Sequence, residues 1–448
     1  MPKELFGTDG IRGVPGAAPL DDETLYRVGR ALGLFLIEHE ARPRVLIGMD
    51  TRESGPHIAR QIAAGLADDG VAAASAGVLT TPGIAYLVRA KGFSAGVVIS
   101  ASHNPYHDNG VKLFAGTGMK FPDEAEERLE QEILRPARPS KSPRADAALR
   151  ADASLAREYL DFLRSRVIPG ANLAGVKLVL DCANGAASTL GPELFRSLGA
   201  DVTAIHDRPN GRNINADCGS LHPEDLRKAV LKTGAALGVA FDGDADRAIF
   251  ASSTGRIVDG DGVLLAAARH LKSSGQLKGA RVVGTSMANL GLERALGEEG
   301  IALSRVPVGD RYVLEELLRS GCNLGGEQSG HVIFLDDATT GDGLLTALKI
   351  VCLVALRGPL DTLVRGLKTF PQTIVNVNVR AKPPLDSLPE FARELDEATR
   401  ALGGAGRIVV RYSGTEPKAR VMVEAERAED VTRWAEALAS AIRSAIGA

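Results

Sequence analysis

Short apolar runs, each followed by a polar loop and a helix-like pattern, repeat along the first two thirds of the chain. The apolar run at 44–49 predicts a buried strand, and the spacing at 53–68 predicts the helix that follows it. Similar runs predict further strands at 96–100, 176–180, 237–241 and 281–284. Strands that alternate with helices in this way are typical of α/β domains.

The last part of the chain has a different pattern. Apolar and polar residues alternate at 374–379, which predicts a half-exposed strand. Strands predicted at 407–410 and 421–424 flank a basic turn, and 431–446 has the spacing of a helix. These elements predict a smaller α+β domain at the C-terminal end.

Two other segments help to divide the chain. The segment 135–144 is rich in Pro, Ser and Arg and has no periodicity, which predicts a surface loop or linker. The apolar run 344–356 is interrupted by Lys349 and is too short for a bilayer, so it predicts a buried helix. We expect four domains, with limits at 1–152, 153–253, 254–367 and 368–448.

Composition narrows the class of protein. With 448 residues, 44% hydrophobic and 24% charged, the chain is typical of a soluble globular protein, and its net charge of −3 gives no basic field for nucleic acid. The N-terminal pattern predicts no signal peptide, so we expect a cytoplasmic protein that binds neither membrane nor nucleic acid. Scattered cysteines predict reduced thiols, not a disulfide frame or a zinc site. They are Cys182, Cys218, Cys322 and Cys352.

A serine lies in a tight loop directly after the strand predicted at 96–100. The run 99–105 reads Ile-Ser-Ala-Ser-His-Asn-Pro, and Pro105 cannot continue a strand. A hydroxyl at a strand end lies where α/β proteins often place their chemistry, although most serines in such loops only cap or make a turn. Ser102 is therefore a candidate whose interpretation depends on the other sites.

Three carboxylates alternate with small residues after the strand predicted at 237–241. They are Asp242, Asp244 and Asp246. Because like charges repel, such a loop is costly unless a cation lies among them. An EF-hand needs Gly at the sixth position and Glu at the twelfth, where this chain has Arg247 and Ser253. A solvated acidic turn is the alternative, but three hard oxygen ligands against an apolar strand favour a Mg²⁺ site.

Two further runs offer groups that suit sugars and phosphates. In the run 325–331, Gly-Gly-Glu-Gln-Ser-Gly-His, the carboxylate of Glu327 and the hydroxyl of Ser329 suit neighbouring sugar hydroxyls. The run 411–420 holds two guanidiniums, two hydroxyls and a glycine, a donor set that suits a dianionic phosphate. These residues are Arg411, Ser413, Gly414, Thr415 and Arg420. Taken alone, the run 325–331 is also consistent with a Gly-rich turn that binds nothing. The run 411–420 is likewise consistent with a basic hairpin.

Together and in this order, the four runs resemble the α-D-phosphohexomutase superfamily over the whole chain. The resemblance implies an α/β fold of three similar domains with mixed sheets, plus a smaller C-terminal α+β domain, with four loops that converge on a central cleft. Within the superfamily, the chain is most similar to the subfamily that acts on glucosamine phosphates. The positions that carry this likeness are 6–13, 100–105, 213–215, Cys218 with Gly219, and Gln328.

The resemblance implies interconversion of glucosamine 6-phosphate and glucosamine 1-phosphate, which feeds amino-sugar nucleotide and cell-wall precursor synthesis. Ser102 would carry the phosphoryl group and pass it on through a sugar bisphosphate. One phosphoserine oxygen would join the three Asp side chains around Mg²⁺. The expected partners are the hexosamine phosphate substrate and a bisphosphate activator, bound by a monomer or homodimer.

The resemblance also assigns further residues to the active site. Lys112, His331 and Arg12 match catalytic positions, and which of them transfers the proton stays open. The expected substrate-binding residues are Arg247, Glu327, Ser329, Arg411, Ser413, Gly414, Thr415 and Arg420. His103 is expected to orient the serine loop, and histidines such as His206 are assigned no role.

Three other functions remain open. A phosphomannomutase/phosphoglucomutase of the same superfamily would use the same machinery on other sugars. A phosphatase of the haloacid dehalogenase type would use Asp242 as its nucleophile and would not need Ser102. A sugar-phosphate sensor would keep the arginines and Glu327 without needing the serine or all three acids.

Overall fold

The computed structural model describes residues 4–7, 9–135, 149–413 and 416–448. It divides into two compact units, a larger one of residues 1–285 with 306–365 and a smaller one of 286–305 with 366–448. The predicted linker, from residue 136 onward, and the site residues Gly414 and Thr415 lie outside the described part. No helix in that part is long and apolar enough to cross a membrane.

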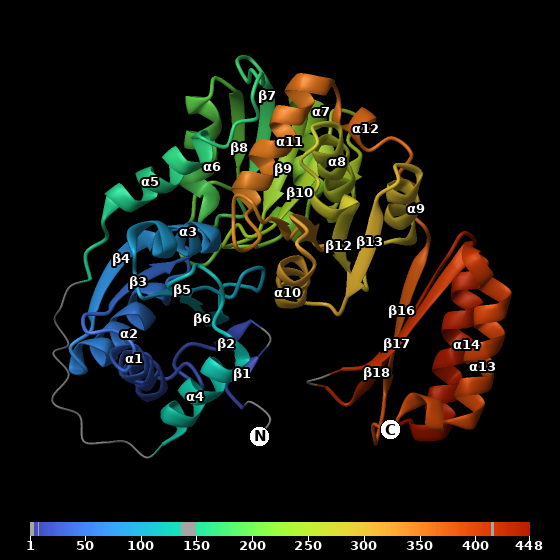
Figure 1. The fold of residues 1–448 in the computed structure, drawn as a ribbon, viewed down its shortest axis with the longest axis horizontal. Helices are drawn as coiled ribbons and strands as arrows, with labels where there is room; N and C mark the ends of the chain where they lie inside the picture. Colours follow the sequence, from blue (N-terminus) through green and yellow to red (C-terminus); the bar gives the residue numbers. More distant parts are fainter. Residues whose placement is uncertain (1–3, 8, 136–148, 414–415) are drawn as a thin grey trace. The chain divides into compact units, whose positions relative to one another are not determined.

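The first sheet of the larger unit has six strands and holds the serine loop (Figure 1). Its strands are β1 (Phe6–Gly7), β2 (Gly10–Gly13), β3 (Arg44–Met49), β4 (Ala72–Val78), β5 (Ala95–Ile99) and β6 (Asn109–Ala115). They lie in the order β1-β2-β6-β5-β3-β4. β3 is parallel to β4 and β5, whereas β6 is antiparallel to β5 and β2, so the sheet is mixed.

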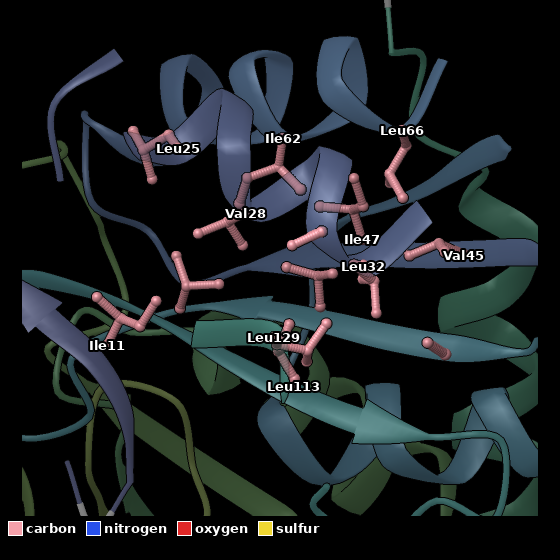
Figure 2. Packing of buried hydrophobic residues seen from close by; sticks show 14 of the residues in the cluster. Ile11, Leu25, Val28, Leu32, Val45, Ile47, Ile62, Leu66, Leu113 and Leu129 are labelled. Atoms are coloured by element: carbon pink, nitrogen blue, oxygen red, sulfur yellow. The ribbon is translucent and has the colours of Figure 1, made fainter. Parts of the chain in front are cut away.

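Helices cover both faces of this sheet (Figure 1). They are α1 (Asp22–Ile37), α2 (Gly55–Asp68), α3 (Thr81–Lys91), α4 (Asp123–Leu134) and α5 (Ala153–Arg164). Figure 2 shows the core in which Leu32 of α1 and Ile62 of α2 lie close to Ile47 of β3; all three are fully buried. This core fixes the strand ends from which the serine loop extends.

The second sheet carries the acidic loop. Its strands are β7 (Lys177–Asp181), β8 (Asp201–Ile205), β9 (Leu237–Phe241), β10 (Ala248–Ser252) and β11 (Ile257–Val258), in the order β11-β10-β9-β7-β8. β7 is parallel to both β8 and β9, and β9 turns back antiparallel into β10 through the acidic loop. The other elements here are α6 (Ala187–Ser197), the short helix η1 (Gly219–Leu221) and α7 (Glu224–Thr233).

The third group of strands carries the run 325–331. β12 (Arg281–Thr285) is parallel to β14 (Leu324–Gly326), and β14 is antiparallel to β15 (Val332–Phe334), with the run turning between them. The helices are α8 (Gly260–Ser273), α10 (Asp310–Ser320), α11 (Gly343–Arg357) and α12 (Leu360–Leu363). α11 is the buried helix predicted at 344–356.

The smaller unit is built on a three-stranded antiparallel sheet in the order β16-β18-β17. Its elements are α9 (Leu290–Glu298), β16 (Gln372–Asn378), α13 (Pro389–Leu402), β17 (Gly406–Tyr412), β18 (Lys418–Ala425) and α14 (Ala428–Ile446), and β13 (Ala302–Val306) ends at its boundary. Phe391, Trp434 and Leu438 are buried in its core. The basic turn connects β17 to β18.

The predicted class, α/β domains with mixed sheets and a C-terminal α+β domain, is confirmed. The strands predicted at 44–49 and 237–241 have those bounds in the structure. The helix predicted from residue 53 begins at Gly55, because Pro56 fits only the first turn of a helix. The four domain limits stay predictions.

Two glycines allow α1 and α2 to pack with their backbones in contact. A Cβ atom at Gly29 would overlap the carbonyl oxygen of Ile62, and one at Gly65 would overlap that of Tyr26. Neither backbone oxygen can move without shifting a whole helix turn. The spacing between the two helices therefore depends on glycine at both positions.

We expect Gly65→Ala to destabilise the larger unit by about 1–3 kcal/mol, the usual cost of overpacking a close contact. Gly297→Ala is the matched control, because a Cβ there meets nothing within 4 Å and alanine favours an exposed helix by about 0.5–1 kcal/mol. Thermal unfolding measures both. A Gly65→Ala protein that melts at the wild-type temperature would contradict this account of the helix pair.

Candidate active site

Ser102 lies in the loop after β5 and reaches the acidic loop directly. Its Oγ donates to Asp242 Oδ2 at 2.5 Å, although the two residues are 140 positions apart. Its amide donates to Ser100 Oγ at 2.9 Å, and its φ of 51° places it in the left-handed region. The structure therefore brings together the predicted nucleophile and the first predicted metal ligand.

A buried arginine holds the serine loop in place. Arg52 is 1% exposed, and its Nε lies 3.0 Å from Asp50 Oδ2. Its two Nη atoms donate to four backbone carbonyls of the loop, those of Ser102, Asn104, Pro105 and Asp108. Burial raises the pKa of Asp50 despite Arg52 and a hydrogen bond from Ser100. No motif in the sequence pointed to either residue of this pair.

The second sheet also contributes to the loop. Asn215 Nδ2 donates to the carbonyl oxygens of Ser102 at 2.8 Å and Asn104 at 3.0 Å. This gives a physical role to the segment 213–215, which the sequence singled out only by resemblance. The carbonyl of Ser102 thus accepts hydrogen bonds from Arg52, which follows a strand of the first sheet, and from Asn215, which follows a strand of the second.

Asp242, Asp244 and Asp246 form a buried cluster in the turn between β9 and β10. One oxygen from each lies within 4.8 Å of the others. Burial and mutual repulsion raise the pKa values of Asp242 and Asp246. Asp244 Oδ1 and Asp246 Oδ1 are buried with no hydrogen-bond partner among the described residues. Unsatisfied carboxylate oxygens that face one another fit a hard divalent cation.

Lys112 on β6 supplies positive charge to this cluster. Its buried Nζ lies 2.9 Å from Asp244 Oδ2 and 3.0 Å from Asp9 Oδ2. Burial disfavours the ammonium form, but these carboxylates outweigh it and hold the pKa of Lys112 well above its usual value. Burial likewise opposes ionisation of Asp244, yet Lys112 and a 2.6 Å hydrogen bond from Thr81 lower its pKa.

A chain of ion pairs leads from this cluster to Asp310, which lies beside His331. Lys120 Nζ lies 2.5 Å from both Asp9 Oδ1 and Asp310 Oδ2, and Asp310 Oδ2 lies 3.7 Å from His331 Nε2. Arg12 joins the chain through Asp9, at 2.7 Å. The structure therefore groups Lys112, Arg12 and His331 around Asp9, Lys120 and Asp310. Asp9 lies in the run 6–13 but was assigned no role, and Lys120 and Asp310 belong to no recognisable motif.

The remaining predicted site residues of the larger unit lie near these ion pairs. Glu327 Oε1 accepts the amide of Gly309 at 3.0 Å, and Ser329 Oγ donates to Glu327 Oε2 at 3.3 Å. Arg247 Nε lies 3.9 Å from Asp246 Oδ1 and has no hydrogen-bond partner in the described chain. His103 Nδ1 lies 3.2 Å from Ser102 Oγ, and burial lowers the pKa of this imidazole to about 4.

In the smaller unit, the basic turn concentrates positive charge. Arg411 and Arg420 face each other across β17 and β18. Arg420 Nη2 lies 3.0 Å from Glu416 Oε2, but its Nε has no partner among the described residues. Ser413 is buried, and its amide donates to the carbonyl of Lys418 at 2.8 Å. Like charges directly opposite each other destabilise a strand pair, so an anion between them is favourable.

A serine hydroxyl that donates a hydrogen bond to a separate loop of three buried aspartates, in a series of α/β domains with a small C-terminal domain, defines a phosphohexomutase. Four domain families match the chain, all described as phosphoglucomutase/phosphomannomutase. The alpha/beta/alpha domains I, II and III match residues 3–139, 157–255 and 259–370, and the C-terminal domain matches 374–441. The chain belongs to this family and, within it, to the phosphoglucosamine mutases, so it is an intramolecular phosphotransferase.

This membership rests on relatives aligned over the full chain. The phosphoglucosamine mutase of Solibacter usitatus is 54% identical over all of both chains, and that of Koribacter versatilis is 50% identical over 99% of this chain and 98% of its own. A phosphoglucomutase/phosphomannomutase family protein from Burkholderia thailandensis has a TM-score of 0.80 at 25% identity, covering 98% and 97%. Aspergillus fumigatus N-acetylphosphoglucosamine mutase, solved with GlcNAc-6P and magnesium, has a TM-score of 0.69 at 20% identity, covering 99% and 96%.

We expect Arg52→Ala to destabilise the larger unit by about 3–5 kcal/mol, because it leaves the Asp50 carboxylate buried without its counter-charge. Arg60→Ala is the control, since Arg60 is exposed on the adjacent helix and such changes usually stay within about 0.5 kcal/mol. Thermal unfolding of both variants tests this. Equal melting temperatures would mean that the Asp50–Arg52 pair does not hold the loop.

Proposed function

We propose that this enzyme interconverts glucosamine 6-phosphate and glucosamine 1-phosphate through a phosphoserine at Ser102 and a glucosamine bisphosphate. The observation that carries the proposal is the 2.5 Å contact between Ser102 Oγ and Asp242 Oδ2, in a chain 54% identical to a phosphoglucosamine mutase. We also propose that the enzyme is cytoplasmic and that it is a monomer or a homodimer.

The reaction has two phosphoryl transfers. In the first, the bond between phosphorus and Ser102 Oγ breaks, and the phosphoryl group joins the free hydroxyl of the sugar monophosphate, whose proton passes to a base. The bisphosphate then reverses its orientation. In the second, the bond between the other phosphorus and its sugar oxygen breaks, that phosphoryl group joins Ser102 Oγ, and the sugar oxygen takes the proton back from the base. Arg52 and Asn215 hold the serine loop by its carbonyl groups, so the loop need not rearrange when Oγ gains or loses the phosphoryl group.

The acidic cluster suits Mg²⁺, and we propose that Asp242, Asp244 and Asp246 hold it together with a phosphoserine oxygen. When bound, the ion neutralises negative charge on the transferring phosphoryl group. Lys112 lies against Asp244 and keeps a positive charge at the edge of the cluster. The proton-transferring group stays open among Lys112, His331 and Arg12.

We propose that Glu327 and Ser329 bind the sugar hydroxyls. Their side chains lie beside each other near Arg247. The phosphate that does not react is assigned to the basic turn, where Arg411, Ser413 and Arg420 flank Gly414 and Thr415. Because the sugar binds in two orientations, this phosphate needs a site separate from the serine. Two facing guanidiniums provide the charge for it.

A first test compares glucosamine, glucose and mannose phosphates as substrates. Glucosamine phosphate should give the highest kcat/KM, with about 10–200-fold discrimination, because a single substituent at C2 separates the sugars. Intact mass after incubation with the bisphosphate should show a phosphoryl group on the wild type and none on Ser102→Ala, which should lose nearly all turnover. A preference for mannose 1-phosphate would support the sister mutases, and an active Ser102→Ala would support the phosphatase reaction through Asp242.

A second test concerns the basic turn. Arg420→Ala should weaken binding of both monophosphate and bisphosphate by about 1.5–3 kcal/mol, the value of a charge-assisted hydrogen bond. Lysine at position 420 should restore only part of the loss, since it cannot make a bidentate contact. Isothermal titration measures the affinity, and Arg393→Ala on exposed α13 is the control. Unchanged affinity in a folded Arg420→Ala would place the phosphate elsewhere.

A further inference from the structure

A second cluster of possible metal ligands lies at the edge of the second sheet. A carboxylate oxygen of Asp181, a ring nitrogen of His206 and the thiol of Cys218 lie within 4.8 Å of one another. Asp181 ends β7 and His206 follows β8, and because these strands are parallel neighbours, both residues lie at the same sheet edge. Cys218 directly precedes η1. No pattern in the sequence gives His206 a role, and the scattered cysteines predict reduced thiols and no zinc site, so this group is not predicted by the sequence.

The cluster is buried on one side and open on the other. Asp181 and Cys218 are 0% and 1% exposed, whereas the His206 side chain is 28% exposed, which gives an ion a path from solvent. His206 Nδ1 lies 3.1 Å from Asp181 Oδ1 but has no aligned hydrogen-bond partner among the described residues. At this hydrogen-bonding distance Asp181 raises the pKa of His206, so an ion that binds Nδ1 takes the place of a proton held between the two side chains.

Groups around the cluster orient its three ligands. The amide of Gly219 donates to Asp181 Oδ2 at 3.0 Å, and Asn184 Nδ2 lies 3.9 Å from Cys218 Sγ. On the far side of the imidazole, His206 Nε2 lies 3.8 Å from Asp225 Oδ2. A carboxylate at the second ring nitrogen is the usual partner of a histidine that binds metal through the first.

A catalytic role for this Asp, His and Cys set does not fit the structure. Burial and the neighbouring Asp181 raise the pKa of the Cys218 thiol to about 12, so Cys218 is not an activated nucleophile. The donor types are also unlike those of the three-aspartate cluster. Thiolate and imidazole favour zinc and similar borderline metals, whereas Mg²⁺ favours oxygen ligands alone.

We propose that Asp181, His206 and Cys218 bind a divalent transition metal of the Zn²⁺ class, with solvent as the fourth ligand. The chain would then hold two metal sites of different chemistry in one domain. The segment that carries Cys218 also reaches the serine loop, because Asn215, three residues before Cys218, donates to the carbonyl of Ser102. A bound ion would tie this segment to the end of β7 and so stabilise the loop from outside the active site.

The test uses Co²⁺, because a cobalt–thiolate bond gives a near-ultraviolet charge-transfer band and cobalt bound by oxygen alone does not. The full chain is reduced with a phosphine and titrated in excess Mg²⁺, which keeps the three-aspartate cluster filled. We expect the band to appear with a single equivalent of Co²⁺ and to disappear when Zn²⁺ is added. Cys218→Ala and His206→Asn should abolish it, whereas Cys322→Ala should leave it unchanged.

The variants are chosen to preserve the fold. Asparagine tolerates the φ of 47° at position 206 and removes the imidazole. Asp225→Asn should weaken Zn²⁺ affinity about 10–100-fold, because loss of the outer partner of a metal ligand usually has that effect. Glu224→Gln, at an exposed position, should leave the affinity unchanged. No band, a band that survives Cys218→Ala, or a band that Zn²⁺ does not displace would overturn the proposal.

Discussion

The crowding of negative charge beside Ser102 is the constraint on which the rest of the site depends. Three carboxylates with oxygens within 4.8 Å of one another, all buried, repel strongly where water is excluded. Lys112 offsets part of this charge and is itself stable in the interior only because Asp244 and Asp9 surround it. The same arrangement leaves two carboxylate oxygens without partners, which is the opening that a divalent cation fits.

Sheet order brings these groups together. The serine loop leaves the first sheet, and the acidic loop and the segment with Asn215 leave the second, each at a strand end where a parallel neighbour finishes. Hydrogen bonds between these loops bring together residues far apart in the sequence. Arg52 then fixes the serine loop through backbone carbonyls, not side chains. These hydrogen bonds depend on the backbone conformation of the loop and only weakly on its side chains.

The sequence predicted the strands and the two catalytic loops because both signals are local. A buried strand is visible in the sequence as an apolar run. Alternating aspartates directly after such a run place like charges close together. Asp50, Arg52, Lys120 and Asp310 gave no such signal, since each is an ordinary charged residue whose partner lies on another element. His206 was missed for the same reason: Asp181 is brought to it by the pairing of β7 with β8, and Cys218 by the path of the segment that follows β8.

The contact between Ser102 and Asp242 also has a consequence for the growing chain on the ribosome. Residues 1–135 can complete the first sheet and its core, but the partners of the serine loop at positions 215 and 242 do not yet exist. At about 5–20 residues per second, roughly 7–28 s pass between synthesis of Ser102 and of Asp242. The serine has no carboxylate partner during that interval and no amide partner until position 215 is made, so a chain interrupted before the second sheet carries an incomplete loop on a finished domain.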